Sequence, residues 1–255
     1  MYKLISFDVN GVLTPDLTMA KLSGLRGNYK IAEKILKLQT SGKKSLKEAF
    51  KELGNLTKGI SLRQAIKYSL GMPLTKGVER LIRVLSNKEI IMVLNTTGYS
   101  ITMHILNKRL EISNKIPFKL VACNNLIFSK DNELVKDPYL KNLITLYFKN
   151  PNSKIYDDIR SNGIVEFGIN DESEKSIFIK KWSKLLKINL KNVVHVGDSM
   201  GDCHALKFIA ENNGLGIAFN PNKALLEFIK KLQPSIRKNI VIIKNDLSLI
   251  LDYIN

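Results

Sequence analysis

Short apolar runs alternate with segments of helical spacing over most of the chain. The runs that predict buried strands lie at residues 5–7, 90–94, 118–123, 193–196, 215–219 and 240–243. In the segments between them, apolar residues recur three and four positions apart, as they do in amphipathic helices. Such alternation is typical of a parallel sheet with helices on both faces. We therefore expect an α/β fold with a doubly wound, Rossmann-like core.

Residues 15–72 interrupt this alternation, because they show helical spacing and no strand pattern. Short helices are expected there at 29–39, 45–53 and 61–70. The second of these starts with a capping box, in which Ser45 is followed three positions later by Glu48. The pattern predicts a small helical domain, residues 15–72, inserted into a core made of residues 1–14 and 73–255.

Further elements follow from the same patterns. A hairpin is expected from 126–128 to 134–136. Helices are expected at 77–86, 99–110, 139–148 and 175–188. The residues expected to face inward from the last of these helices are Ile177, Trp182, Leu185 and Leu186. No function follows from the segment 138–170, for which a loop bordering a cleft and an oligomer contact are both open.

Polar side chains stand where three of the strands end. Asp8 follows the first strand. The second strand ends in Thr96 and Thr97, and the fourth ends in Asp198 and Asp202. The carboxyl ends of parallel strands meet at one edge of the sheet, where open α/β sheets bind ligands. Singly, each residue also has an ordinary explanation, since Asp is common in turns and at helix N-termini.

Lys175 completes the set, 23 positions before Asp198 and at the start of a helix. The motifs FDVNG around Asp8, LNTTG around Thr96, Lys175 itself and VGDSMGD around Asp198 occur in that order. In this arrangement the chain resembles the haloacid dehalogenase-like (HAD) superfamily, and within it the phosphoserine-phosphatase-like branch. The likeness extends to the segments GLGIAFNP and NDL near the end of the sequence. It implies a HAD core whose helical cap, residues 15–72, closes over the active site.

The resemblance implies phosphoryl-transfer roles for these residues. Asp8 would be the nucleophile and would form an aspartyl-phosphate. Magnesium, which prefers oxygen ligands, would be held by Asp8, Asp198 and the main-chain carbonyl of Asn10. Asp202 would bind the metal or orient Lys175.

The same resemblance implies contacts to the phosphate. Thr96 would donate to a phosphate oxygen, and Lys175 would neutralise charge on the other side. The neighbouring phosphate-binding residues are expected to be Asn95, Thr97, Gly98 and Gly11. The function expected from this set is magnesium-dependent hydrolysis of a small phosphomonoester, so the partner is a small anionic phosphate ester.

Asn10 departs from the pattern of the superfamily's phosphatases, which carry a second Asp two positions after the nucleophile. That Asp protonates the leaving oxygen and later activates water, and an amide does neither. Loss of a general acid or base costs ~100- to 10,000-fold in rate. Three explanations are open. The leaving group needs no protonation, the protein binds phosphate esters without turnover, or Asn10 stands in for Asp through a sequence change or deamidation.

The cap departs from the pattern as well. Phosphoserine phosphatases hold the amine and the carboxylate of their substrate with a cap Glu and a cap Arg. The corresponding positions here are Leu17 and Leu53, with Asp16 and Lys51 adjacent. A small phosphomonoester other than phosphoserine is therefore expected. Phosphonate hydrolysis through a cap lysine stays open as another reaction class, whereas a dehalogenase would not need the two metal acids.

The chain is strongly basic, with 40 Lys and Arg against 23 Asp and Glu and a net charge of +17. Such a charge attracts nucleic acid, but no basic tract is interleaved with aromatic residues, and Lys-rich composition is also typical of thermophile proteins. We expect no nucleic-acid partner. Residues 15–72 hold 12 basic and 4 acidic residues. They either form solvated helix faces or steer an anionic substrate.

Localisation follows from what the sequence lacks. No apolar run reaches the ~18 residues of a membrane span, and the first residues predict a strand, not a signal peptide. Cys123 and Cys203 are too few for a zinc site or a disulfide framework. We expect a soluble, cytoplasmic protein without a membrane partner.

Overall fold

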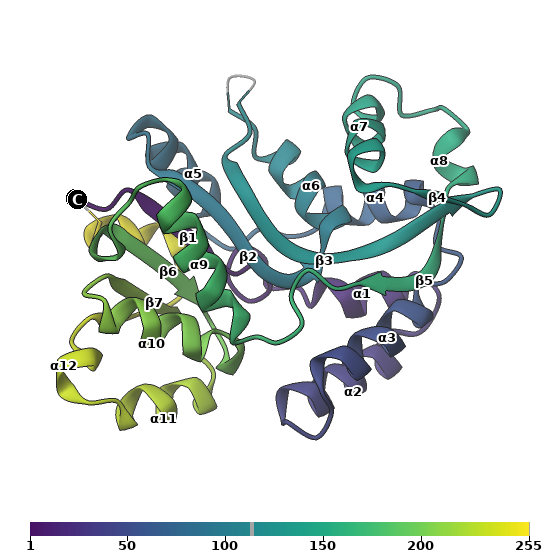
Figure 1. The fold of residues 1–255 in the computed structure, drawn as a ribbon. Coiled ribbons are helices and arrows are strands. Elements are labelled where there is room, and N and C mark those ends of the chain that lie inside the picture. The colour runs from purple at the N-terminus through teal and green to yellow at the C-terminus, as the bar shows by residue number, and fades with distance from the viewer. Residues whose placement is uncertain (113–114, 255) are drawn as a thin grey trace.

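The computed structural model describes residues 1–112 and 115–254. Its sheet has the strand order β4-β3-β2-β1-β6-β7-β8, and β5 also pairs with β3 (Figure 1). The strands are β1 (Leu4–Phe7), β2 (Ile91–Tyr99), β3 (Phe118–Lys130), β4 (Glu133–Val135), β5 (Arg160–Glu166), β6 (Val193–Gly197), β7 (Leu215–Phe219) and β8 (Ile240–Ile243). The pairs from β3 through β1 to β8 are parallel, so the expected α/β core is confirmed.

Helices flank this sheet. The α-helices are α1 (Thr18–Gly24), α2 (Tyr29–Thr40), α3 (Leu46–Leu56), α4 (Leu62–Gly71), α5 (Val78–Asn87), α6 (Ser100–Arg109), α7 (Asp137–Tyr147), α8 (Ile155–Asp158), α9 (Glu174–Leu185), α10 (Cys203–Glu211), α11 (Lys223–Lys231) and α12 (Pro234–Arg237). The short 3-10 helices are η1 (Leu190–Asn192), η2 (Met200–Asp202) and η3 (Leu247–Asp252). Within the described residues, no helix has both the length and the apolar character of a membrane span.

β1 is the central strand of the core, because it pairs in parallel with β2 on one side and with β6 on the other. Ile5 and Phe7 share a hydrophobic cluster with α5 and η3, whereas Leu4 packs with α9 and α10 on the opposite face. Successive strand side chains point to opposite faces, so a continuous apolar run suits a strand that is covered on both sides. β1 therefore delivers Asp8 to the middle of the sheet's carboxyl edge.

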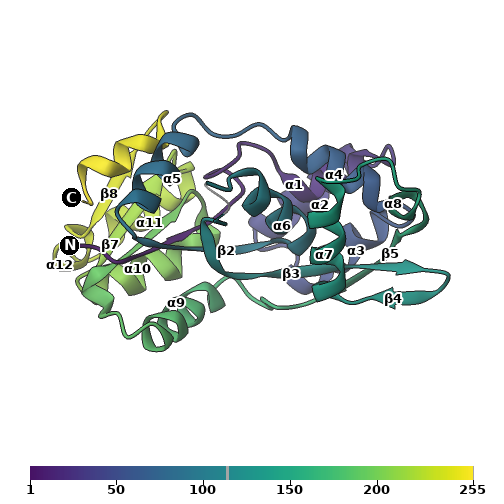
Figure 2. The same ribbon diagram turned by 90° about the horizontal axis from the view of Figure 1, so that it is seen from above.

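The helices α1–α4 do not pack alone. Their apolar residues form one hydrophobic cluster with the distal half of β3, with β5 and with α7. Main-chain hydrogen bonds also join the two segments, since Leu62 N–H donates to the carbonyl of Ile159 and Ser161 N–H donates to that of Ile60. Figure 2 shows the resulting two lobes, with β2 and β3 running between them. We propose that the cap comprises residues 15–72 together with the segment from the distal half of β3 to β5.

Two local expectations are wrong. The hairpin forms, since β3 pairs antiparallel with β4, but its first arm and the third strand, expected as separate elements, are one continuous strand, β3. On α9, Ile177 and Leu185 are exposed by 61% and 66%, whereas Ile179 and Trp182 are buried. The reason is that α9 presents only a narrow stripe to the sheet, and Lys175 belongs to that buried stripe.

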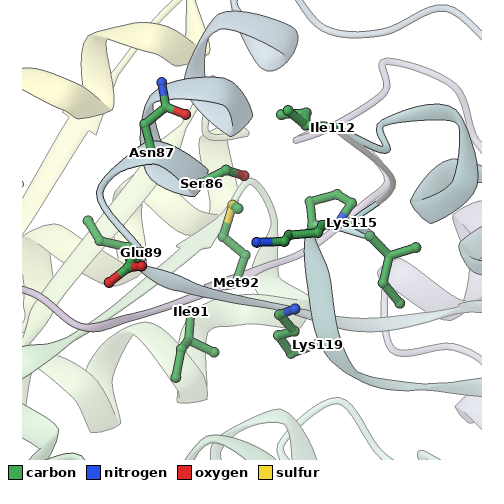
Figure 3. Close-up of a pocket in the computed structure, with 11 residues that line it drawn as sticks. Ser86, Asn87, Glu89, Ile91, Met92, Ile112, Lys115 and Lys119 are labelled. Atoms are coloured by element: carbon green, nitrogen blue, oxygen red, sulfur yellow. The ribbon is translucent and has the colours of Figure 1, made fainter.

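A cavity of about 390 Å³ lies at the opposite edge of the sheet from Asp8. Its wall includes Ile91, which pairs with Leu4 at the amino end of β1. Figure 3 shows Lys115 and Lys119 on one side of this cavity and Glu89 on the other. None of the residues predicted for the site lines it.

Candidate active site

The turn after β1 places Asp8 against the loop after β6. The main-chain N–H of Asp8 donates to the carbonyl of Val196, and Val9 N–H donates to Asp8 Oδ1 at 2.6 Å. Gly11 has a φ of +77°, a conformation that favours glycine. A Cβ at Gly11 would lie 2.2 Å from Asp198 Oδ2. The two loops therefore approach so closely that only glycine fits between them.

Lys175 connects two of the acids. Its Nζ donates to Asp8 Oδ2 at 2.9 Å and to Asp202 Oδ1 at 2.7 Å, and the residue is only 2% exposed. Burial disfavours the ammonium, but the carboxylates of Asp202 and Asp8 outweigh that effect and raise the pKa of Lys175 above its ordinary value. Lys175 is therefore a fixed positive charge beside Asp8.

Asp202 is fully buried and takes part in several hydrogen bonds. Besides Lys175, its Oδ1 contacts His195 Nε2 at 3.2 Å, and its Oδ2 accepts from Asp198 N–H at 3.2 Å. A carboxylate only accepts, so Nε2 carries the proton and Nδ1 accepts from Ser6 Oγ at 3.1 Å. The cations Lys175 and, when protonated, His195 oppose the cost of burial and hold the pKa of Asp202 below its usual range. Asp202 thus orients Lys175 and the loop of Asp198.

The acids form a cluster that suits a metal ion. Carboxylate oxygens of Asp8, Asp198 and Asp202 lie within 4.8 Å of one another. Burial, with the charges of Asp202 and Asp8, raises the pKa of Asp198 to about 8. When ionised, the three clustered carboxylates exceed the charge of Lys175, and a divalent cation would neutralise the excess. Clustered carboxylate oxygens are the donors that Mg²⁺ prefers, so these residues fit the expected ion.

The carboxyl end of β2, residues 95–98, lies next to this cluster and is called the β2 corner here. Thr96 is buried, and its Oγ1 accepts from Gly98 N–H at 3.2 Å. Asn95 Nδ2 donates to the main-chain carbonyl of Lys175 at 2.9 Å, while its Oδ1 is buried without a partner. The carbonyl of Thr97 accepts from Asn124 Nδ2 at 3.0 Å. Asn95 therefore positions α9, and Thr97 ties the corner to β3.

Asn10 lies between the cap and this corner. Its Oδ1 accepts from the main-chain N–H of Thr18, the first residue of α1, at 3.2 Å. A Cβ at Gly98 would lie 3.7 Å from Asn10 Nδ2 and 3.5 Å from Thr96 Oγ1. Asn10 is thus near the expected phosphate-binding residues as well as the nucleophile.

Two residues of the site were missed by sequence reasoning, apart from His195. Gln39 at the end of α2 donates to Glu172 Oε1 at 3.2 Å, which joins the cap to the core. A Cβ at Gly201 would lie 2.8 Å from the same oxygen, so Glu172 borders the Asp198 loop. Burial raises the pKa of Glu172. The sequence gives only weak signals for two of these residues. Glu172 lies three positions before Lys175, and His195 interrupts an apolar strand.

Comparison with known proteins matches this geometry. No family model matches the chain. A phosphoserine phosphatase of Methanocaldococcus jannaschii is 25% identical over 252 residues, 99% of this chain and 97% of the relative. One of Archaeoglobus fulgidus is 24% identical over 223 residues, 88% of this chain and 54% of the relative. The chain is similar over nearly its whole length to HAD-like phosphatases of the phosphoserine-phosphatase-like branch.

Solved structures show the same fold. One described as a phospho-aspartyl intermediate analogue of phosphoserine phosphatase is 24% identical, with a TM-score of 0.72 and coverage of 100% of this chain and 99% of that chain. A substrate-bound phosphoserine phosphatase complex gives 24% identity, a TM-score of 0.73 and the same coverage. The resemblance stated from the motifs is confirmed. In this chain the same fold brings Asp8, Lys175 and Asp198 together at one edge of the sheet.

Proposed function

We propose that this HAD-like phosphatase hydrolyses small phosphomonoesters with Mg²⁺, through an aspartyl-phosphate on Asp8. The observation that carries the proposal is the position of the Asp8 carboxylate, which lies between Lys175 and Asp198 at the carboxyl edge of the sheet. A buried carboxylate pair with one neighbouring lysine suits phosphoryl transfer, in which positioning and charge stabilisation supply most of the rate.

The acids and the lysine around Asp8 would have different roles in this reaction. Mg²⁺ would be held by Asp8, Asp198 and the main-chain carbonyl of Asn10, and when bound it supplies the positive charge that lets an anionic ester approach Asp8. Lys175 holds Asp8 in place and balances charge on the phosphoryl oxygens. Asp202 keeps Lys175 in position.

The end of β2 would hold the phosphate. Thr96 Oγ1 would donate to a phosphoryl oxygen. The N–H groups of Gly98 and Gly11 donate here to Thr96 Oγ1 and to the carbonyl of Thr14, and would have to give up those bonds to reach the phosphate. Asp8 then attacks phosphorus, a new O–P bond forms, and the P–O bond of the ester breaks. Water later cleaves phospho-Asp8 and releases phosphate.

Phosphoserine is not the substrate that we propose. Leu53 is fully buried in the hydrophobic cluster of the cap, and Leu17 is partly exposed without any charge to offer. The nearby Asp16 accepts from the Tyr68 hydroxyl at 3.3 Å. An amine and a carboxylate on the substrate would therefore lack their charge partners, whereas the basic cap favours an ester that is anionic overall.

A panel of small phosphomonoesters that includes phosphoserine tests this function. We expect magnesium-dependent phosphate release by the purified protein, and none by Asp8→Asn, which keeps the shape of the side chain but not the nucleophile. Turnover that persists in Asp8→Asn would contradict the role of Asp8. Phosphoserine as the best substrate of the panel would contradict only the specificity.

Asn10 favours a second candidate, a protein that binds phosphate esters without turning them over. The two candidates separate on Asn10→Asp. Retained phosphate-ester binding with no turnover, in both the starting protein and Asn10→Asp, would establish the binding protein. Turnover that appears or rises in Asn10→Asp would establish the phosphatase site.

A further inference from the structure

The hydrogen bond to the cap fixes the orientation of the Asn10 amide. Thr18 N–H is a donor, so the group that faces it at 3.2 Å must be Oδ1. Nδ2 is then turned toward the corner formed by Thr96 and Gly98, since a Cβ at Gly98 would lie 3.7 Å from it. Asn10 therefore presents an N–H donor to the corner where the phosphate is expected.

This geometry points to a substrate class and a fate for the intermediate, both of which rest on the proposed function. We propose that Asp8 takes a phosphoryl group from donors whose leaving group departs as a stable anion, namely acyl and aryl phosphates. We further propose that phospho-Asp8 then persists instead of being hydrolysed rapidly. Asn10 is the residue that sets both properties.

The first step selects the donor. Asp8 forms its bond to phosphorus while the P–O bond to the leaving group breaks, and the leaving group takes the electron pair. An alkoxide needs a proton at that moment, whereas a carboxylate or a phenolate does not. The amide N–H of Asn10 is far too weak an acid to transfer a proton, and the Lys175 ammonium already donates to two carboxylates. The buried hydroxyl of Thr18, which has no hydrogen-bond partner among the residues that the structure describes, is too weak an acid to replace it.

The second step is the slow one. Water that attacks phospho-Asp8 must lose a proton, and an amide cannot accept it. The Nδ2 of Asn10 instead donates toward the phosphoryl oxygens, which favours the intermediate over its hydrolysis. Asp16, the next acid along the chain after the nucleophile Asp8, already accepts from the Tyr68 hydroxyl. Hydrolysis is therefore slowed by ~100- to 10,000-fold relative to a protein with Asp at this position.

Intact-protein and peptide mass spectrometry test the proposal. The protein is incubated with Mg²⁺ and either acetyl phosphate or glycerol phosphate. We expect acetyl phosphate to add one phosphate to the peptide that contains Asp8, and glycerol phosphate to add none. Asp8→Asn should remain unlabelled. Asn10→Asp should turn over both compounds without a persistent adduct.

A series of aryl phosphates adds a second readout. In the starting protein, the rate of phosphorylation should depend steeply on the pKa of the leaving group, and in Asn10→Asp the dependence should be shallow. Equal dependence, or rapid glycerol phosphate hydrolysis by the starting protein without an adduct, would overturn this inference and leave the proposed function standing. Failure of both proteins to react at Asp8 with any of these phosphates would overturn both.

Discussion

The ammonium of Lys175 lies 2.9 Å from Asp8 Oδ2, although 167 positions separate the two residues in the sequence. The helix that carries Lys175 packs on the sheet through Ile179 and Trp182, so the lysine enters the core along the same stripe. A buried ammonium is stable only when it is paired. The contact therefore links the stability of the core to the charge of the nucleophile.

Replacing Lys175 tests that link. Lys175→Met leaves buried carboxylates without their cation, so we expect a loss of about 3 to 5 kcal/mol in the free energy of unfolding. Activity should fall by ~100-fold or more. Lys180→Met, on the exposed face of the same helix, is the matched control and should behave like the starting protein. Chemical denaturation and phosphate release measure the two effects, and similar behaviour of both variants would contradict the role of Lys175.

Gly11 offers a test of the contact between the two loops. In Gly11→Ala the new Cβ would lie 2.2 Å from Asp198 Oδ2, so the acid must move and the metal cluster is distorted. We expect Gly11→Ala to lose the magnesium-dependent rise in Tm and most of the activity. Gly27→Ala is a matched control, because Gly27 has nearly the same positive φ, +78°, and nothing within 4 Å of the added carbon. It should cost about 1 to 2 kcal/mol and keep the magnesium response.

The raised pKa of Asp198 determines how pH should affect stability and magnesium binding. Its pKa in the metal-free protein is about 8, against an ordinary value of 3.8. The native state therefore binds more protons than the unfolded state in that window, and this group makes the metal-free protein less stable as pH rises from about 4 to 8. The lowered pKa of Asp202 acts in the opposite direction, but only as pH falls below its ordinary value.

Magnesium must displace the proton on Asp198 below pH 8, so the rise in Tm on adding Mg²⁺ should grow between pH 6 and pH 8. Thermal unfolding with and without the ion at both pH values measures it. Asp198→Asn, which has no proton to displace, should lose most of the magnesium response at both. A response of equal size at pH 6 and pH 8 in the starting protein would argue against Asp198 as a ligand.

Site residues could be predicted from the sequence where they directly follow an apolar run. Asp8 follows a strand that is buried on both faces, and its place at the sheet edge could be predicted from that run alone. The burial of Lys175 could not, because a lysine at the start of a basic helix looks like any surface lysine. The continuity of β3 was hidden by the polar pair Asn124 and Asn125, which interrupt its apolar pattern.

Contacts across the cap were beyond prediction for a different reason. Gln39 and Glu172 are 133 positions apart, and nothing in the local pattern of either residue points to the other. The orientation of the Asn10 amide likewise depends on where the first cap helix begins, because Thr18 N–H is its partner. Such relationships arise only when two lobes pack, so they require the structure.

The contact between Gln39 and Glu172 ties the end of α2 to the core beside the Asp198 loop. A hydrogen bond between neutral groups contributes about 0.5 to 1.5 kcal/mol, and one to a carboxylate such as that of Glu172 contributes more. Gln39→Glu replaces it with two facing carboxylates, one of which is already desolvated. We expect the cap to open and the KM of the best substrate to rise about tenfold, whereas Lys34→Ala on the exposed face of α2 should change nothing.

Exchanging the side chains of Gln39 and Glu172 separates the loss of their hydrogen bond from the general effect of a new negative charge on α2. The double variant Gln39→Glu with Glu172→Gln restores one amide and one carboxylate, so its KM should return most of the way to that of the starting protein. The coupling in this cycle should be about 1 kcal/mol or more, as for residues in direct contact. Hydrogen exchange of α2 should follow the same order, with the fastest exchange in Gln39→Glu. A double variant no better than Gln39→Glu would show that the two side chains do not meet in solution, and the cap would then close without this tie.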